Sequence, residues 1–192
     1  MRAFIGDKQS VAELVTTQQL YQLLGIRNLL TDDEMNINNA LKNSTAQGAI
    51  SNEKYADGIS SFHYQGVGGV EWVNWKFKVK PNSNYKLVVK ANTSNQLNGY
   101  HDMTWSISTN ACLGNFFSEK GDIATDQMPL PWEGTRSLIF NFNSQNNAEL
   151  YLCACFGLLN DNIPTDISIK LELFTADTLQ DQIDDLKSHL GK

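Results

Sequence analysis

Apolar residues recur at every second position through much of the chain after residue 70. In residues 71–79, Val73, Trp75, Phe77 and Val79 alternate with tryptophan, asparagine and lysine residues. Successive side chains of a β-strand point to opposite faces of its sheet, so this alternation predicts a strand with one buried and one solvated face. Later segments with the same alternation carry the apolar sets Tyr85/Leu87/Val89/Ala91, Met103/Trp105/Ile107, Leu138/Phe140/Phe142, Leu150/Leu152/Ala154/Phe156 and Ile167/Ile169/Leu171/Leu173.

Connectors rich in asparagine, serine, glycine and aspartate separate these segments, at residues 92–98, 114–122, 143–147 and 160–165. Such residues favour turns, because they hydrogen-bond their own backbone or tolerate a positive φ. Two or three further strands are expected before residue 72 and around residues 113–124. Many alternating strands joined by turns predict an all-β fold, an antiparallel β-sandwich of the jelly-roll type.

Helical patterns flank the predicted sandwich on both sides. Ser10 and Glu13 fit a capping box ahead of an apolar run that ends at Gly25. Near the other end, a heptad-like apolar seam consists of Leu179, Ile183, Leu186 and Leu190. This seam predicts an amphipathic helix that either packs on its own sandwich or forms a short coiled coil with other copies, of which a trimer is favoured.

The composition fits one folded domain with short appendages. We expect a helical anchor (1–25), a β-sandwich (26–175) and a C-terminal helix (176–192). Of the 192 residues, 41% are hydrophobic and 19% are charged, and 4 are prolines, which excludes disorder and collagen-like repeats. The net charge of −6 argues against a nucleic-acid partner. No apolar run approaches the roughly 20 residues of a membrane span, so neither membrane insertion nor a signal peptide is expected.

Three cysteines and three histidines show no spacing typical of a metal site. Cys153 and Cys155 lie two residues apart, which places both thiols on one face of a strand, whereas Cys112 is distant in sequence. The histidines are scattered over different segments. We therefore expect ordinary buried thiols in a protein that folds in a reducing compartment, with no metal and no cofactor.

Catalytic motifs in their required structural context are absent from the sequence. The glycine-rich residues 66–69 precede a strand instead of a helix, which favours a loop or bulge over a phosphate site. The acidic residues Asp32, Asp33 and Glu34 are expected in a polar connector. A non-catalytic protein, with no catalytic residues, is therefore predicted.

Three short segments resemble carbohydrate-binding-module-like jelly rolls. The sequence KPNSNY at residues 80–85 joins two predicted strands, as in the hairpins of that group. The sequence DISIKLEL at residues 166–173 is similar to its closing strand, and IRNLLT at residues 26–31 resembles the segment that precedes such modules in phage tail, baseplate and fibre proteins. The resemblance covers residues 26–174 and implies a jelly roll of a phage virion.

Saccharide recognition on such a fold requires flat aromatic rings with hydrogen-bonding groups beside them. Trp72 is out of phase with the buried residues of its strand, so its ring is expected on the solvated face. Tyr100, His101 and Asp102 lie at the start of a predicted strand, and Trp132 ends the proline-rich loop sequence PLPW. These five residues are the predicted ligand contacts.

Two classes of function fit these features. In the first, the chain is a non-catalytic phage fibre, baseplate or decoration subunit that binds a host cell-surface polysaccharide. In the second, it is a virion assembly module without a ligand, and a bacterial surface glycan-binding protein is a further alternative. As a virion protein it would fold in the host cytoplasm, form a homo-oligomer and contact other virion proteins.

Overall fold

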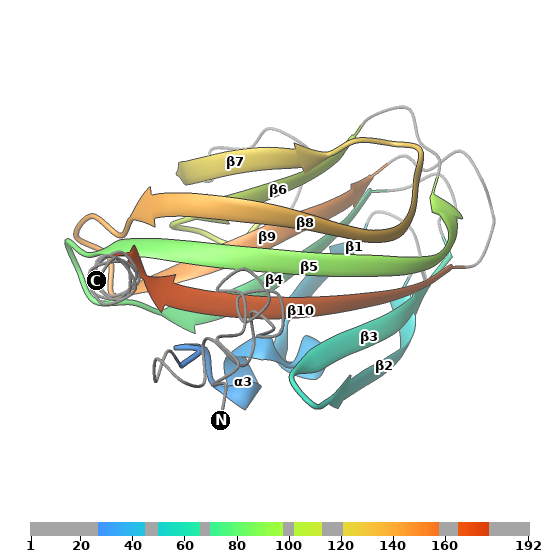
Figure 1. Cartoon of the computed structure of the whole chain (residues 1–192), viewed down its shortest axis with the longest axis horizontal. Coiled ribbons are helices and arrows are strands. Elements are labelled where there is room, and N and C mark those ends of the chain that lie inside the picture. The colour runs from blue at the N-terminus through green and yellow to red at the C-terminus, as the bar shows by residue number, and fades with distance from the viewer. Residues whose placement is uncertain are drawn as a thin grey trace, which may run out of the picture.

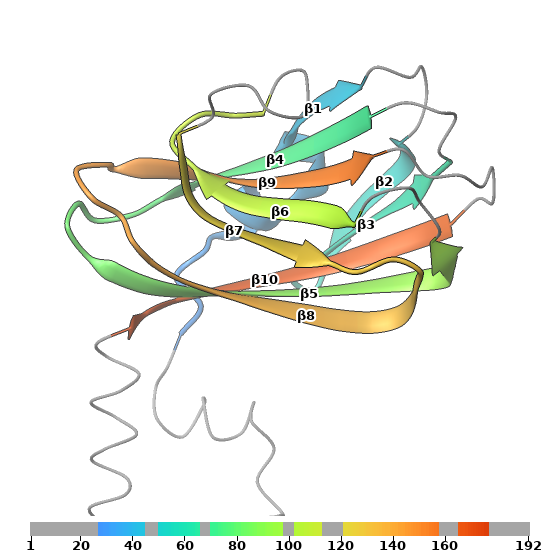
Figure 2. The same cartoon turned by 90° about the horizontal axis from the view of Figure 1, so that it is seen from above.

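The chain folds into two antiparallel β-sheets packed face to face (Figure 1). The computed structural model describes residues 27–44, 50–65, 70–97, 102–112, 121–157 and 165–176. Within these ranges, ten strands divide equally between the two sheets, and Figure 2 shows the two layers from above. The predicted all-β antiparallel sandwich is confirmed.

The first sheet has the order β1–β4–β9–β6–β7, and the second has the order β2–β3–β10–β5–β8. The strands of the first sheet are β1 (Leu41–Ser44), β4 (Val70–Lys78), β9 (Glu149–Gly157), β6 (Met103–Ser108) and β7 (Asp122–Met128). The strands of the second sheet are β2 (Ile50–Ala56), β3 (Ile59–Tyr64), β10 (Thr165–Thr175), β5 (Asn84–Leu97) and β8 (Trp132–Asn143). A short helix, α3 (Asp32–Met35), and a 3₁₀ turn, η1 (Ile37–Asn39), precede β1.

The core lies between the two sheets and contains every apolar residue that the alternating pattern placed there. At its centre the indole rings of Trp75 and Trp105 stack, with centroids 6.5 Å apart and planes 7° from parallel. The ring of Phe156 meets Trp105 edge-on at 6.1 Å. These three rings belong to the first sheet, and Phe156 also meets Phe62 of the second sheet edge-on at 5.5 Å, so aromatic contact and burial together hold the layers against each other.

One predicted connector is wrong. Residues 92–98 were expected to form a loop, but β5 continues to Leu97. The buried alternation continues to Thr93, the pairing with β8 then shifts in register, and Leu97 is buried again, while Asn92 and Ser94 are exposed. A strand whose outer face is polar can resemble a connector in sequence, because only its inward-facing residues have to be apolar.

The segment before α3 is bound to the edge of β10, beyond the point where β3 ends. The Asn28 side chain donates to the Leu171 carbonyl at 2.8 Å and accepts from the Leu173 amide at 2.8 Å. The Leu29 amide donates to the Leu173 carbonyl at 2.9 Å. These bonds satisfy strand-edge groups of β10 and place residue 28 next to the end of the last strand.

The predicted helical anchor (1–25) and the apolar seam of the predicted C-terminal helix lie outside the described residues. Both stay predictions, as do the domain boundaries. Among the described residues, no helix has the length and apolar character required to cross a membrane.

A cluster of charges lies on the outer face of the second sheet. Lys170 of β10 and Lys90 of β5 are directly opposite each other in register. Glu172 lies between them, with its carboxylate 2.8 Å from Lys170 Nζ and 3.4 Å from Lys90 Nζ. Burial alone would raise the pKa of Glu172, but the two ammonium groups outweigh burial, and the pKa lies below its ordinary value.

We expect Ile169→Ala to lower the free energy of unfolding by about 2–5 kcal/mol, because it leaves a cavity between the sheets. Ile169 is 1% exposed. Ile139→Ala is the matched control, since Ile139 is 52% exposed on a strand of the same sheet and should change stability by at most about 0.5 kcal/mol. Urea unfolding measures both. Equal losses would contradict the assignment of the two faces.

Glu172→Gln should lower stability at pH 7 by up to about 1 kcal/mol, because it removes the charge that both lysines contact. The folded-state pKa of Glu172 is depressed. Its contribution is therefore present above the unfolded-state pKa, near 4.3, and is lost as the pH falls through the folded-state value. Urea midpoints of the variant and the wild type should converge once the pH has fallen below the depressed folded-state pKa of Glu172. Glu133→Gln, at an exposed position, is the control, and a difference that persists at low pH would refute the ion-pair explanation.

Candidate functional site

Trp72 lies on the outer face of the first sheet, but the prediction that its ring is solvated is wrong. The side chain is 1% exposed and packs in a small cluster with Cys112, Cys153 and Cys155. Tyr151 packs against the same cluster. The prediction of buried thiols is therefore confirmed, and the indole offers no open face for a ligand to stack on.

Asn74 explains why this outer face is covered. Its side-chain nitrogen donates to the carbonyls of Cys112 at 3.2 Å and Leu41 at 3.1 Å, and its oxygen accepts from the Cys112 amide at 2.8 Å. These bonds hold the chain that follows β6 against the outer face of β4. Because Asn74 and Trp72 share that face, the returning chain buries surface that the strand pattern alone would leave in water.

Asp102 is bound to the segment that leads into Trp132. The Asp102 carboxylate accepts a hydrogen bond from the Leu130 amide at 2.9 Å, two residues before Trp132. The expectation that the loop presents this indole is wrong, because Trp132 is fully buried in the core and its Nε1 donates to the Gly134 carbonyl at 3.0 Å. Tyr100 and His101 lie outside the described residues. The structure does not bring Trp72 together with Asp102 and Trp132, and the ligand role of all five residues stays a prediction.

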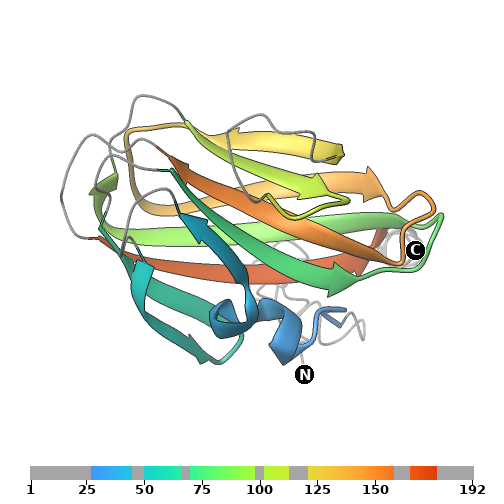
Figure 3. The same ribbon diagram turned by 180° about the vertical axis from the view of Figure 1, so that it is seen from behind.

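A different region offers an open binding space. Strand β1 pairs with residues 71–74 of β4, and beyond Asn74 no strand among the described residues lies beside this edge. Helix α3 and turn η1 stand next to this edge, and Figure 3 shows α3 beside the end of β4. Between them is a hollow of about 530 Å³. The hollow is lined by Thr31, Asp33, Glu34, Asn39, Ala40, Trp75, Lys76 and Lys78.

Glu34 fixes α3 to the strand edge. Thr31 and Glu34 form a capping box, in which the Thr31 amide donates to Glu34 Oε2 at 2.8 Å and the Glu34 amide donates to Thr31 Oγ1 at 3.3 Å. The other carboxylate oxygen of Glu34 accepts the Lys78 amide at 2.8 Å. The polar connector expected here is thus a capped helix. Its signal, T-x-x-E at residues 31–34, was present in the sequence and was missed.

Two further carboxylates of this region differ in their partners. The Tyr55 hydroxyl donates to Asp32 at 2.7 Å. Burial, reinforced by Asp32, raises the pKa of Tyr55 above its ordinary value. The Asp33 carboxylate lies exposed, and no described residue makes a hydrogen bond or ion pair with it. Asp33 is therefore the acidic group of the hollow that is available to a ligand.

The two lysines of the hollow also differ. Lys76 Nζ is 2.7 Å from a Glu149 carboxylate oxygen and lies 6.0 Å from the ring centroid of Tyr151. The hydrogen bond to Glu149 raises the pKa of Lys76. The ammonium group of Lys78 has neither an ion pair nor a hydrogen bond within the part of the chain that the structure describes, and its side chain is exposed. Lys78 is thus the cation that a ligand could recruit.

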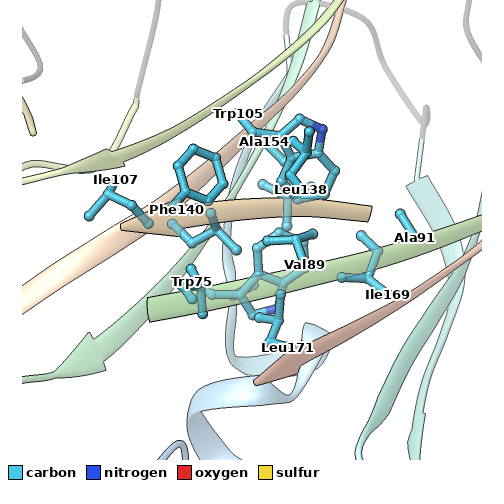
Figure 4. Close-up of a cluster of buried hydrophobic side chains, with 14 of the residues drawn as sticks. Trp75, Val89, Ala91, Trp105, Ile107, Leu138, Phe140, Ala154, Ile169 and Leu171 are labelled. Atoms are coloured by element: carbon cyan, nitrogen blue, oxygen red, sulfur yellow. The ribbon is translucent and has the colours of Figure 1, made fainter. Parts of the chain in front are cut away.

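Trp75 lines the hollow from the core side. Its indole Nε1 is buried, and no hydrogen-bond acceptor for it occurs among the described residues. Figure 4 shows the indole nitrogens of Trp75 and Trp105 turned away from each other. A buried donor without an acceptor costs about 1–3 kcal/mol. The phase of Trp75 correctly predicted burial, but it gave no sign that the residue also borders an open space.

The chemistry of the hollow is that of a binding site for a polar ligand. It offers acceptors on Asp33 and Asn39 and a donor on Lys78. The Asn39 side-chain nitrogen already donates to the Asp33 carbonyl at 3.2 Å, which leaves its oxygen as the acceptor. No group of three or more metal-ligating side chains occurs in the described ranges.

Comparison with known proteins supports the fold. No protein-family model matches the chain, and a search of curated proteins gives no match. A CBM4 carbohydrate-binding module superposes with a TM-score of 0.51 and 10% identity, over 78% of this chain and 95% of that chain. A CBM61 module in complex with β-1,4-galactotriose superposes with a TM-score of 0.49 and 8% sequence identity, over 78% of this chain and 99% of that chain. A third match is the enzymatically active domain of tailspike protein 4 of bacteriophage CBA120. Its TM-score is 0.45 and its sequence identity is 14%, over 77% of this chain and 21% of that chain. The chain thus has the jelly-roll fold of carbohydrate-binding modules, as the sequence resemblance implied.

Proposed function

We propose that this protein is a non-catalytic phage virion subunit whose β-sandwich binds a host cell-surface saccharide in the hollow beside β4. The observation that carries the proposal is the mixed lining of that hollow, in which acidic, amide and basic residues border a space of about 530 Å³. This volume is within the range of sites for small ligands.

A saccharide matches such a lining because each hydroxyl group both donates and accepts hydrogen bonds. The carboxylate of Asp33 and the side-chain oxygen of Asn39 accept from hydroxyl groups, and the ammonium of Lys78 donates to them. An inorganic anion would favour donors alone, and a metal cation would favour acceptors alone. The combination of both kinds on one space favours a polyhydroxyl ligand.

The fold supports the same function. The jelly roll is shared with the CBM4 module, a carbohydrate-binding module, over most of both chains. A shared fold is not a shared site, so the hollow itself has to carry the specific proposal. The absence of a catalytic motif in the sequence supports a binding role without catalysis.

The virion part of the proposal rests on the segment around Asn28 and on the two ends of the sandwich. Residues 26–31 resemble the segment that precedes such modules in phage tail proteins. In the structure this segment is bound to Leu173, so the chain enters and leaves the sandwich at adjacent points (Figure 2). A predicted anchor and a predicted oligomerisation helix would then attach on one side of the module.

We expect the full chain to bind at least one polysaccharide in a panel of host cell-surface glycans, measured by affinity electrophoresis. The double variant Asp33→Ala/Lys78→Ala should weaken binding at least about tenfold, because it removes two ligand-directed hydrogen bonds to charged groups. Glu133→Ala/Arg136→Ala is the charge-matched control on exposed positions of β8, and it should bind like the wild type. Loss of binding in the control alone would place the site elsewhere.

The proposal of a homo-oligomer is based on the predicted apolar seam of Leu179, Ile183, Leu186 and Leu190. The full chain should scatter light as an oligomer, with a trimer expected. A chain that ends at Ala176, and the full chain with Ile183→Asp and Leu186→Asp, should scatter as monomers. Equal masses for all three proteins would refute the oligomerisation role of the seam.

A further inference from the structure

The residues that line the hollow carry equal numbers of negative and positive charges, and this balance indicates which class of saccharide the hollow would bind. Two lining residues are acidic, Asp33 and Glu34, and two are basic, Lys76 and Lys78. On the basis of the proposed function, we infer that the hollow selects uncharged saccharides and discriminates against uronic acids and other anionic sugars.

Two of these four charges are engaged within the protein. The Glu34 carboxylate is occupied by the amides of Thr31 and Lys78 and by the Thr31 hydroxyl. Lys76 is paired with Glu149. Breaking either arrangement to bind a ligand would detach α3 from β4 or leave a carboxylate without its partner, so neither group is well suited to neutralise a charged sugar.

The remaining charges, Asp33 and Lys78, have opposite signs and border the same space. A spherical hollow of about 530 Å³ is about 10 Å across, which is comparable to the Debye length of about 10 Å at 0.1 M salt, so a bound ligand experiences both charges. Hydroxyl groups can donate to Asp33 and accept from Lys78 without any net charge. A carboxylate attracted to Lys78 would be repelled by Asp33, and an ammonium attracted to Asp33 would be repelled by Lys78.

Two further features act in the same direction. Asn39 is a neutral residue of the lining, and its side-chain oxygen can accept from a hydroxyl group without requiring a charge on the ligand. The chain as a whole carries a net charge of −6, so its long-range field slows the approach of polyanionic glycans. The first feature favours neutral sugars within the hollow, and the second favours them during encounter.

The test uses two pairs of probes that differ only in oxidation at C6: methyl glucoside with methyl glucuronide, and methyl galactoside with methyl galacturonide. NMR titration of the full chain gives a Kd for each. The neutral member should bind at least about fivefold more tightly than the uronide, because the opposite charges of Asp33 and Lys78 offset each other and the cost of removing the carboxylate from water remains. Asp33→Asn should shift that ratio about fivefold toward the uronides, and Lys78→Gln should shift it the other way. Glu133→Gln, at an exposed position on β8, is the control and should leave the ratio unchanged.

The outcomes separate the inference from the function on which it rests. Tighter binding of the uronides by the wild type, or ratios that Asp33→Asn and Lys78→Gln leave unchanged, would overturn the neutral selectivity while saccharide binding stands. If none of the four probes and no polysaccharide of the glycan panel binds, both the neutral selectivity and the proposed saccharide binding are overturned.

Discussion

The inward-facing side chains of two sheets have to fill one shared core, and the rest of the structure depends on this constraint. In β4 it directs Trp75 into the core, where the ring stacks on Trp105. Because side chains alternate along a strand, the neighbouring Lys76 then points outward. The hollow thus combines a core tryptophan with surface lysines on one short stretch of β4, and the order of residues along the strand determines that combination.

A second constraint creates the space itself. An edge strand exposes unpaired backbone groups, which proteins cover or blunt. Here β1 covers only the first half of the β4 edge, and the carboxylate of Glu34 takes the place of a strand by accepting the Lys78 amide. One side chain therefore both satisfies the strand edge and fixes α3 beside β4. The hollow exists because this edge is capped by a carboxylate instead of being paired along its whole length.

The sequence was sufficient for six of the ten described strands and their inner faces, because burial between two sheets makes every second residue of such a strand apolar. The strands β1, β2, β3 and β7 were expected only as two or three further strands without defined faces. It failed where burial depends on contacts distant in sequence. Trp72 was expected in water, yet Asn74 holds the chain at Cys112 over the same face, and no local pattern encodes that contact. The hollow was missed for the same reason, since it joins residues 31–40 to residues 75–78. The capping box at Thr31 and Glu34 could have revealed the helix, but not the docking of its carboxylate on the Lys78 amide.

The central claim is that a saccharide occupies the hollow beside β4, and chemical-shift mapping with a bound sugar tests it most directly. With ¹⁵N-labelled protein and a neutral methyl glycoside, the account predicts the largest changes at the Trp75 indole N–H and at the amides of Asp33 and Asn39. Changes concentrated on the outer face of the first sheet, around Tyr151, with the Trp75 indole signal unmoved, would contradict it.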